Sequence, residues 1–178
     1  MTTFLILMVI VQTFAISLGT GSSTLAIINF FAAIADGTID ETERRMMGIV
    51  YKVLRIAMVA ILLSTVLLVA NTYSQTGLMN LPAFYFAQAF TLFVLYVNAL
   101  LMTAHLVPST FGPGIQAGSW YTLGTLAALQ IAGTTDFKFL AFFLGYIAWI
   151  VLAIGIVNGV MAILKSKKST VDKTKTDN

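Results

Sequence analysis

Cysteine is absent from the 178 residues, and this absence removes several kinds of protein from consideration. A chain without cysteine has no disulfide framework, no thiolate-ligated iron–sulfur cluster and no thiolate zinc site. A single histidine is present, at position 105, so a haem with two axial histidines would need a second protomer. The acidic residues and this histidine form no cluster with metal-ligand spacing. We therefore expect neither a metal nor a cofactor.

Charge is also scarce. Charged residues make up 10% of the chain and hydrophobic residues 58%, whereas a typical soluble domain is about 25% charged. No Asp, Glu, Lys or Arg occurs in residues 4–35, 56–104 or 139–164. Because about 20 mostly apolar residues cross a bilayer as a helix, each stretch holds at least one span. The sequence predicts an all-α integral membrane protein whose first partner is the lipid bilayer.

Segments rich in Gly, Pro and polar residues divide the chain into five predicted transmembrane helices in one bundle, residues 1–164. The predicted spans are residues 4–35, 41–71, 83–106, 115–132 and 137–164. The first two would measure about 45–48 Å against a hydrocarbon core of about 30 Å. We therefore expect an antiparallel hairpin that extends beyond the bilayer. Residues 165–178 are polar and lysine-rich, and they predict a disordered tail.

The basic residues predict the orientation. Nine of the ten lysines and arginines fall on one side when the spans alternate, and Lys138 alone falls on the other. Because basic residues are enriched in cytoplasmic loops, we expect the N-terminus outside and both the hairpin tip and the C-terminus in the cytoplasm. The pI of 9.3 then reflects a tail near anionic headgroups, and it does not indicate nucleic-acid binding.

Cap signals mark the hairpin tip. Gly37 is placed to end the first helix as a residue in the left-handed conformation. Asp40 is placed to cap the second helix, and Glu43 three residues later completes a capping box.

The first candidate site is a polar layer at the predicted inner boundary. Counting from a turn centred near Thr38 places Arg55 at the depth of Gly21, within the segment GTGSST of residues 19–24. A break in the helix there would free backbone N–H groups for an anionic or polar ligand. The predicted lining residues are Gly21, Ser22, Ser23, Thr24, Lys52, Arg55 and His105. The alternative interpretation is that small residues pack helices closely and basic side chains reach toward water at helix ends.

The third span carries a polar stripe. Gln88, Thr91, Asn98 and His105, with Leu95 and Met102 between them, follow one another at spacings of three and four residues. They therefore share one helix face, which we expect to point into the bundle because lipid satisfies no hydrogen bonds. The stripe could line a translocation path or bond helices together.

The fifth span holds Gly155 and Gly159 around Asn158. This GxxxG spacing permits close helix contact, either within the bundle or between protomers.

These features support three functional hypotheses. The first is a permease-like or channel-like protein that handles a small polar or anionic solute, as a homo-oligomer or in a larger membrane complex. The second is a non-transporting accessory or assembly subunit. The third is a membrane enzyme that uses His105 and Arg55 at the inner interface. A water-accessible cavity along the third helix would favour the first hypothesis, and a dry bundle with an exposed small-residue face would favour the second.

Overall fold

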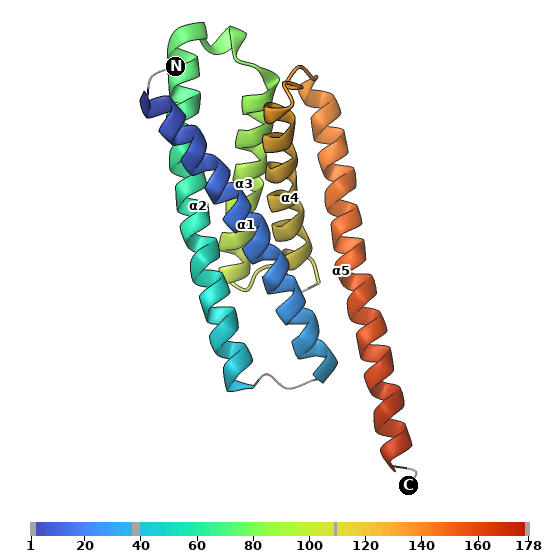
Figure 1. The fold of residues 1–178 in the computed structure, drawn as a ribbon. Coiled ribbons are helices and arrows are strands. Elements are labelled where there is room, and N and C mark those ends of the chain that lie inside the picture. The colour runs from blue at the N-terminus through green and yellow to red at the C-terminus, as the bar shows by residue number, and fades with distance from the viewer. Residues whose placement is uncertain (1–2, 37–39, 109, 177–178) are drawn as a thin grey trace.

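The computed structural model describes residues 3–36, 40–108 and 110–176, and this part of the chain is all-helical (Figure 1). Its elements are α1 (Thr3–Asp36), α2 (Glu41–Thr76), the short 3-10 helix η1 (Leu78–Asn80), α3 (Ala83–Thr103), α4 (Gly112–Ile131) and α5 (Phe139–Thr176). The α-helices run up and down. The start of α1 and the α2–α3 and α4–α5 connections lie at one end, and the C-terminal end of α5 lies at the other (Figure 1).

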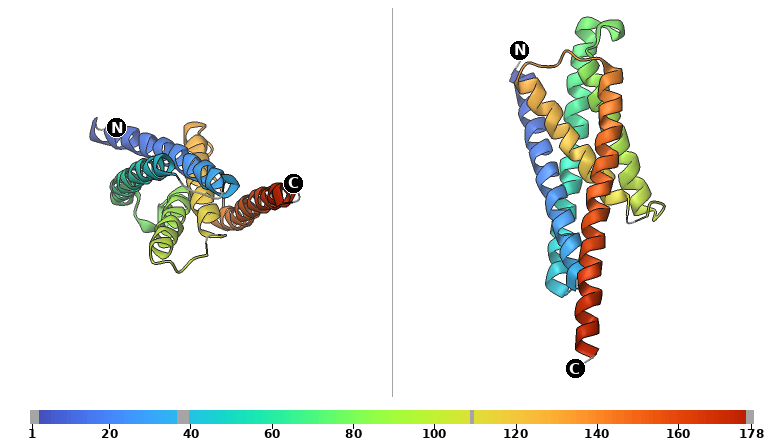
Figure 2. Two further views of the ribbon diagram at one scale, coloured as in Figure 1. Left: turned by 90° about the horizontal axis from the view of Figure 1, so that it is seen from below. Right: turned by 90° about the vertical axis from the view of Figure 1, so that its right-hand side faces the viewer.

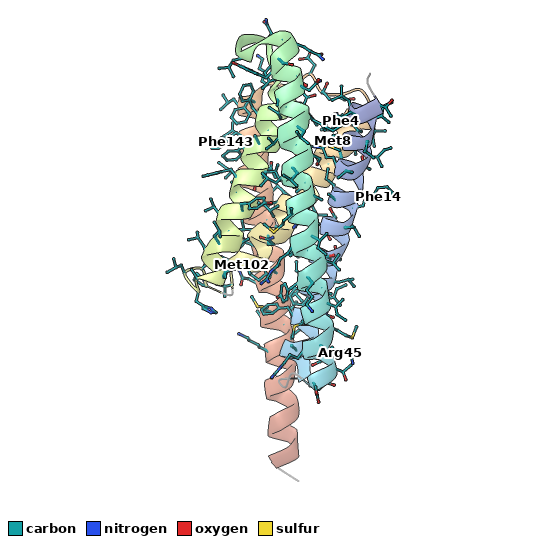
Figure 3. The ribbon with its side chains drawn as sticks, turned by 90° about the vertical axis from the view of Figure 1, so that its left-hand side faces the viewer. Phe4, Met8, Phe14, Arg45, Met102 and Phe143 are labelled. Carbon is teal, nitrogen blue, oxygen red and sulfur yellow. The ribbon has the colours of Figure 1, made fainter. Side chains whose placement is uncertain are left out.

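Four of the helices are long and apolar enough to cross a membrane: α1, α2, α3 and α5. Their outer surfaces carry large exposed hydrophobic side chains, among them Phe4 and Phe14, which project from the outer side of α1 (Figure 3). Phe14 is 65% exposed, as are Ile56 on α2 and Phe93 on α3. Such a surface cannot be stable in water, and it indicates a lipid bilayer environment.

Helix α4, which the sequence predicts as the fourth span, is not among these four. Seen along the bundle, it lies between α1, α3 and α5 (Figure 2), and it packs against all three. Ten of its twenty residues are buried, with Trp120 and Leu123 completely inaccessible. A helix enclosed by other helices needs no apolar outer face, so α4 can carry Gly, Ser, Thr and Gln.

Helices α1 and α2 form the predicted antiparallel hairpin, and α1 is unbroken through residues 19–24. The Gln12 side-chain amide donates to Thr65 Oγ1 over 3.0 Å, and this register places Arg55 at the depth of Ser22. The capping box is confirmed, since Glu43 N–H donates to the Asp40 carboxylate over 2.6 Å and Asp40 N–H to Glu43 over 3.1 Å. The predicted role of Gly37 lies outside the described residues.

Several helix boundaries differ from the predicted ones. Helix α5 continues to Thr176, where the sequence predicts a disordered tail after residue 164. Lysine has a good helix propensity, so a polar segment can extend a helix that has already formed. Helix α3 instead ends at Thr103, before the predicted boundary at residue 106. The lower ends of α1, α2 and α5 consequently project beyond the α3–α4 connection (Figure 1).

Candidate functional site

The GTGSST segment of α1 packs closely against α4. A methyl group built at Gly19 would overlap the six-membered ring of Trp120, so only glycine admits this approach. Thr20 Oγ1 donates to the Trp120 carbonyl oxygen over 3.3 Å, and the Thr24 and Tyr121 hydroxyl oxygens lie 2.7 Å apart. These contacts are those of a helix–helix interface built on small residues.

The seven residues of the predicted ligand layer do not share one site. Ser22 and Ser23 are buried, whereas Gly21, Lys52, Arg55 and His105 are exposed. Arg55 lines an outer groove with Met8 and Val11, and it makes no hydrogen bond or ion pair within the described residues. The α1–α2 register places Arg55 at the depth of Ser22. Within the described residues, however, no hydrogen bond joins Arg55 to Ser22 or Ser23, and Arg55 does not line the cavity that Ser23 lines.

His105 lies just beyond the end of α3, in the left-handed conformation with φ 57°. Its N–H donates to the Met102 carbonyl over 3.1 Å, and the N–H of Leu106 donates to the Leu101 carbonyl over 2.9 Å. This pair of bonds is a Schellman motif, with His105 at the position that glycine usually occupies. The sequence predicts that His105 continues the inward stripe of α3. This prediction is wrong, because α3 ends at Thr103, before His105. No hydrogen bond joins it to Arg55 in the described chain.

The rest of the stripe points inward as predicted, with Gln88 3%, Thr91 0% and Asn98 4% exposed. Of these three side chains, Asn98 makes the most hydrogen bonds. Its amide nitrogen donates to the Gly112 carbonyl over 3.0 Å and to the Gln116 side-chain oxygen over 3.1 Å, and it lies 3.4 Å from Met102 Sδ. Asn98 therefore fastens α3 to the first turns of α4.

The sequence did not predict the close interface between α4 and α5. Gly114 and Gly118 of α4 face α5. A methyl group built at Gly114 would lie 2.9 Å from Ile154 Cα, and a methyl group built at Gly118 would lie 2.7 Å from Ile150 Cδ1. Trp149 Nε1 donates to the Gly118 carbonyl over 3.0 Å. Gly114 and Gly118 have the same GxxxG spacing as the pair in α5, so the signal was present in the sequence.

Gly155 and Gly159 of α5, by contrast, face open space. They belong to an exposed line of mostly small residues that repeats at spacings of three and four along α5: Ala141, Gly145, Ala148, Leu152, Gly155, Gly159 and Ala162. The buried residues of α5, which include Tyr146, Ala153 and Val157, lie on the opposite side. We call this line the outer face of α5.

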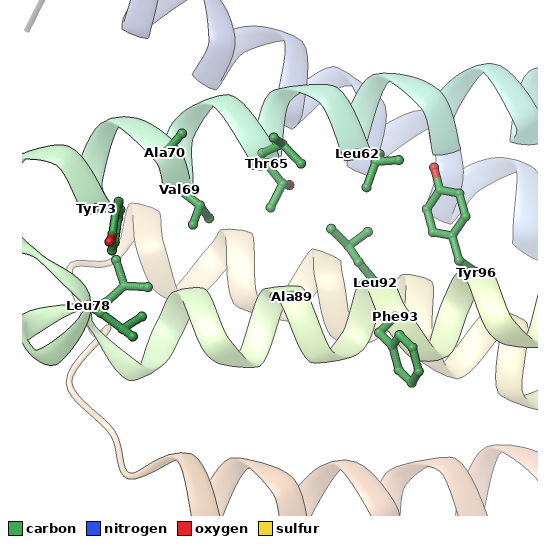
Figure 4. Close-up of a pocket in the computed structure, with 12 residues that line it drawn as sticks. Leu62, Thr65, Val69, Ala70, Tyr73, Leu78, Ala89, Leu92, Phe93 and Tyr96 are labelled. Carbon is green, nitrogen blue, oxygen red and sulfur yellow. The ribbon is translucent and has the colours of Figure 1, made fainter.

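Two hollows in the bundle differ in chemistry. An apolar groove of about 650 Å³ lies between α2 and α3, with Leu62, Val69 and Leu92 among its lining residues (Figure 4). A smaller cavity of about 60 Å³ lies where α1, α2, α3 and α4 meet, and Ser23 and Gln116 are in its wall. We call this second hollow the Ser23 cavity.

Within the described residues, no group of three His, Cys, Asp or Glu side chains could hold a metal ion. Comparison with known protein families, curated proteins and solved structures found no match to this chain.

Proposed function

We propose that this chain is a non-transporting subunit of a membrane assembly, and that the outer face of α5 is its docking surface for another transmembrane helix. The observation that carries the proposal is the open space at Gly155 and Gly159. Glycine inside a helix is destabilising by roughly 0.5–1 kcal/mol relative to alanine. Gly114 and Gly118 offset this through close packing inside the bundle, but Gly155 and Gly159 have no such contact with any described residue.

The physics of membrane association supports the same proposal. Lipid tails are as apolar as leucine, so helices in a bilayer associate through close backbone approach and interhelical hydrogen bonds. A face of mostly small residues allows a second helix to approach closely along several turns. The outer face of α5 has this character from Ala141 to Ala162.

The interior supports assembly over transport. Three pairs that involve buried polar groups join one helix to the next: Gln12 to Thr65, Asn98 to Gln116, and Ser119 to Tyr146, whose hydroxyl oxygens lie 2.8 Å apart. Polar residues used in this way lock a bundle and are not free to coordinate a passing solute. These bonds favour the accessory-subunit hypothesis over the permease-like one.

The absence of cysteine makes the test direct, because one introduced cysteine is the only thiol in the chain. A photoactivatable crosslinker is attached at Ala148→Cys or at Leu152→Cys, both on the outer face of α5, and irradiated in native membranes. Ile147→Cys, which is exposed but lies off this face, is the matched control.

We expect discrete adducts from Ala148→Cys and Leu152→Cys and much weaker ones from Ile147→Cys. An adduct of twice the chain mass identifies a second copy, and another reproducible mass identifies a different subunit. Equal crosslinking at all three positions, or lipid adducts alone, would contradict the proposal.

A further inference from the structure

The Ser23 cavity lies at the junction of four helices. Its wall comprises side chains of α1 around Ser23, Tyr51 and Leu54 of α2, Met102 of α3, and Pro113 and Gln116 of α4. No residue of α5 takes part, so the cavity is separate from the outer face of α5. Met102, at the lower end of α3, can be found in Figure 3.

The polar groups around this cavity have unused hydrogen-bonding capacity. Ser23 is only 2% exposed, yet its hydroxyl makes no hydrogen bond within the described residues. The oxygen of the Gln116 carboxamide accepts from Asn98, but its nitrogen has no partner in this part of the chain. The side-chain oxygen of Asn98 is buried without a partner, but Asn98 is not in the cavity wall. The Ser23 hydroxyl and the Gln116 amide nitrogen can therefore each bond a molecule that occupies the cavity.

The size of the cavity limits its occupant. A water molecule needs about 10–15 Å³ of such volume and two to four polar partners. The cavity, at about 60 Å³, therefore has room for several water molecules or for one molecule of a few heavy atoms.

The charge of the wall further limits the occupant. None of its nine lining residues is charged, because Lys52 and Arg55 lie elsewhere on α2. The first turn of α4 is also a poor anion site. Gly112 N–H already donates to the Pro108 carbonyl over 3.3 Å, and Pro113 has no N–H. An ion in this cavity would lose its hydration without gaining a counter-charge.

We propose that the Ser23 cavity binds a small uncharged molecule that both donates and accepts hydrogen bonds, held between the Ser23 hydroxyl and the Gln116 carboxamide. The hydroxyl can donate or accept, and the carboxamide nitrogen donates. Tyr51, which is 48% exposed, also lines the cavity. The occupant is a short amide or a molecule of similar chemistry and size.

The test is a titration of the intact chain in detergent micelles with formamide, a neutral molecule of three heavy atoms. The side-chain amide resonances of Gln116 are followed by NMR, and sodium chloride is titrated separately as the anionic probe. Ser23→Ala removes the hydroxyl. Ser17→Ala is the matched control, since Ser17 is exposed on the same helix and its hydroxyl bonds only to the Thr13 carbonyl.

We expect a saturable shift of the Gln116 resonances with formamide. Ser23→Ala should weaken it roughly fivefold, the effect of losing one hydrogen bond, and Ser17→Ala should not change it. Contacts between Gln116 and water should fade as formamide saturates. The proposal is overturned if only chloride shifts Gln116, if Ser23→Ala leaves the titration unchanged, or if water contacts persist at high formamide. None of these outcomes bears on crosslinking from α5.

Discussion

Gly19 of α1 lies directly against the six-membered ring of Trp120 of α4, so closely that even one methyl group at residue 19 would overlap three of the ring carbons. Trp120 is completely buried and belongs to the main core cluster together with Leu54, Ile61 and Leu95. The absence of a side chain at Gly19 is therefore what allows α1 to close over the centre of the bundle.

This contact predicts that Gly19→Ala lowers the free energy of unfolding by about 1–3 kcal/mol, the usual effect of inserting a methyl group into a filled core. Gly21→Ala is the control, because a Cβ at Gly21 meets nothing within 4 Å. The control should be neutral or slightly stabilising, since alanine favours the helix over glycine. Denaturant unfolding in detergent, followed by tryptophan fluorescence, measures both. Equal effects of the two substitutions would show that Trp120 does not occupy this position.

The matching ends of α3 and α4 give a second prediction. Gly133 follows α4 with φ 70° and has the same Schellman motif as His105 after α3. Its N–H donates to the Gln130 carbonyl, and the N–H of Thr134 donates to the Leu129 carbonyl. A non-glycine residue in this conformation carries roughly 1–2 kcal/mol of strain. His105→Gly should therefore stabilise the protein by about this amount, and Gly133→Ala should destabilise it similarly. Thermal unfolding in detergent measures both. A loss of stability in His105→Gly would mean that the imidazole makes a contact of its own.

A double-mutant cycle tests whether Asn98 and Gln116 bond α3 to α4. Asn98→Ala and Gln116→Ala should each destabilise the bundle, and the double variant should lose less than the sum. The expected coupling is about 0.6 kcal/mol, and up to about 1.7 kcal/mol, as for other interhelical hydrogen bonds in membranes. Unfolding in mixed micelles gives the three free energies. Simple additivity would indicate that the two amides do not interact.

Alanine substitution should affect the stability of the single chain differently in the two GxxxG pairs, Gly114/Gly118 of α4 and Gly155/Gly159 of α5. Gly114→Ala should destabilise the single chain by about 1–3 kcal/mol, because the new methyl group would meet the backbone of Ile154. Gly155→Ala should leave unfolding unchanged or slightly improved while it weakens crosslinking from Leu152→Cys. Unfolding in detergent and crosslinking in membranes are measured on the same variants. Strong destabilisation by Gly155→Ala would place that face inside the bundle.

The orientation predicted from the basic residues can be tested with single cysteines. Ser74→Cys, at the end of α2, should react with a membrane-impermeant maleimide added to intact cells. Arg45→Cys, near the start of α2 and at the lower end of the bundle (Figure 3), should react only after the membrane is permeabilised. The reverse pattern would invert the topology.

Short-range physics explains what could be read from the sequence alone. The charge-free runs predicted the long helices, since hydrocarbon accepts few other structures. Asp40 and Glu43 predicted the start of α2, because a capping box depends on residues only three apart. Counting along α1 and α2 also predicted the depth of Arg55, because two helices joined by a short turn run side by side at a fixed rise per residue.

Tertiary structure decided what depends on residues far apart in the chain. The GxxxG pairs of α4 and α5 have the same spacing, yet only Gly114 and Gly118 have a helix against them. Ser22 and Ser23 are adjacent in the sequence, but the wall of the Ser23 cavity includes Ser23 and not Ser22, together with Gln116 from 93 residues later. The sequence determined which helices form and where they start, since those energies are local. The tertiary structure determined which helix faces meet, because close packing depends on the shapes of both partners.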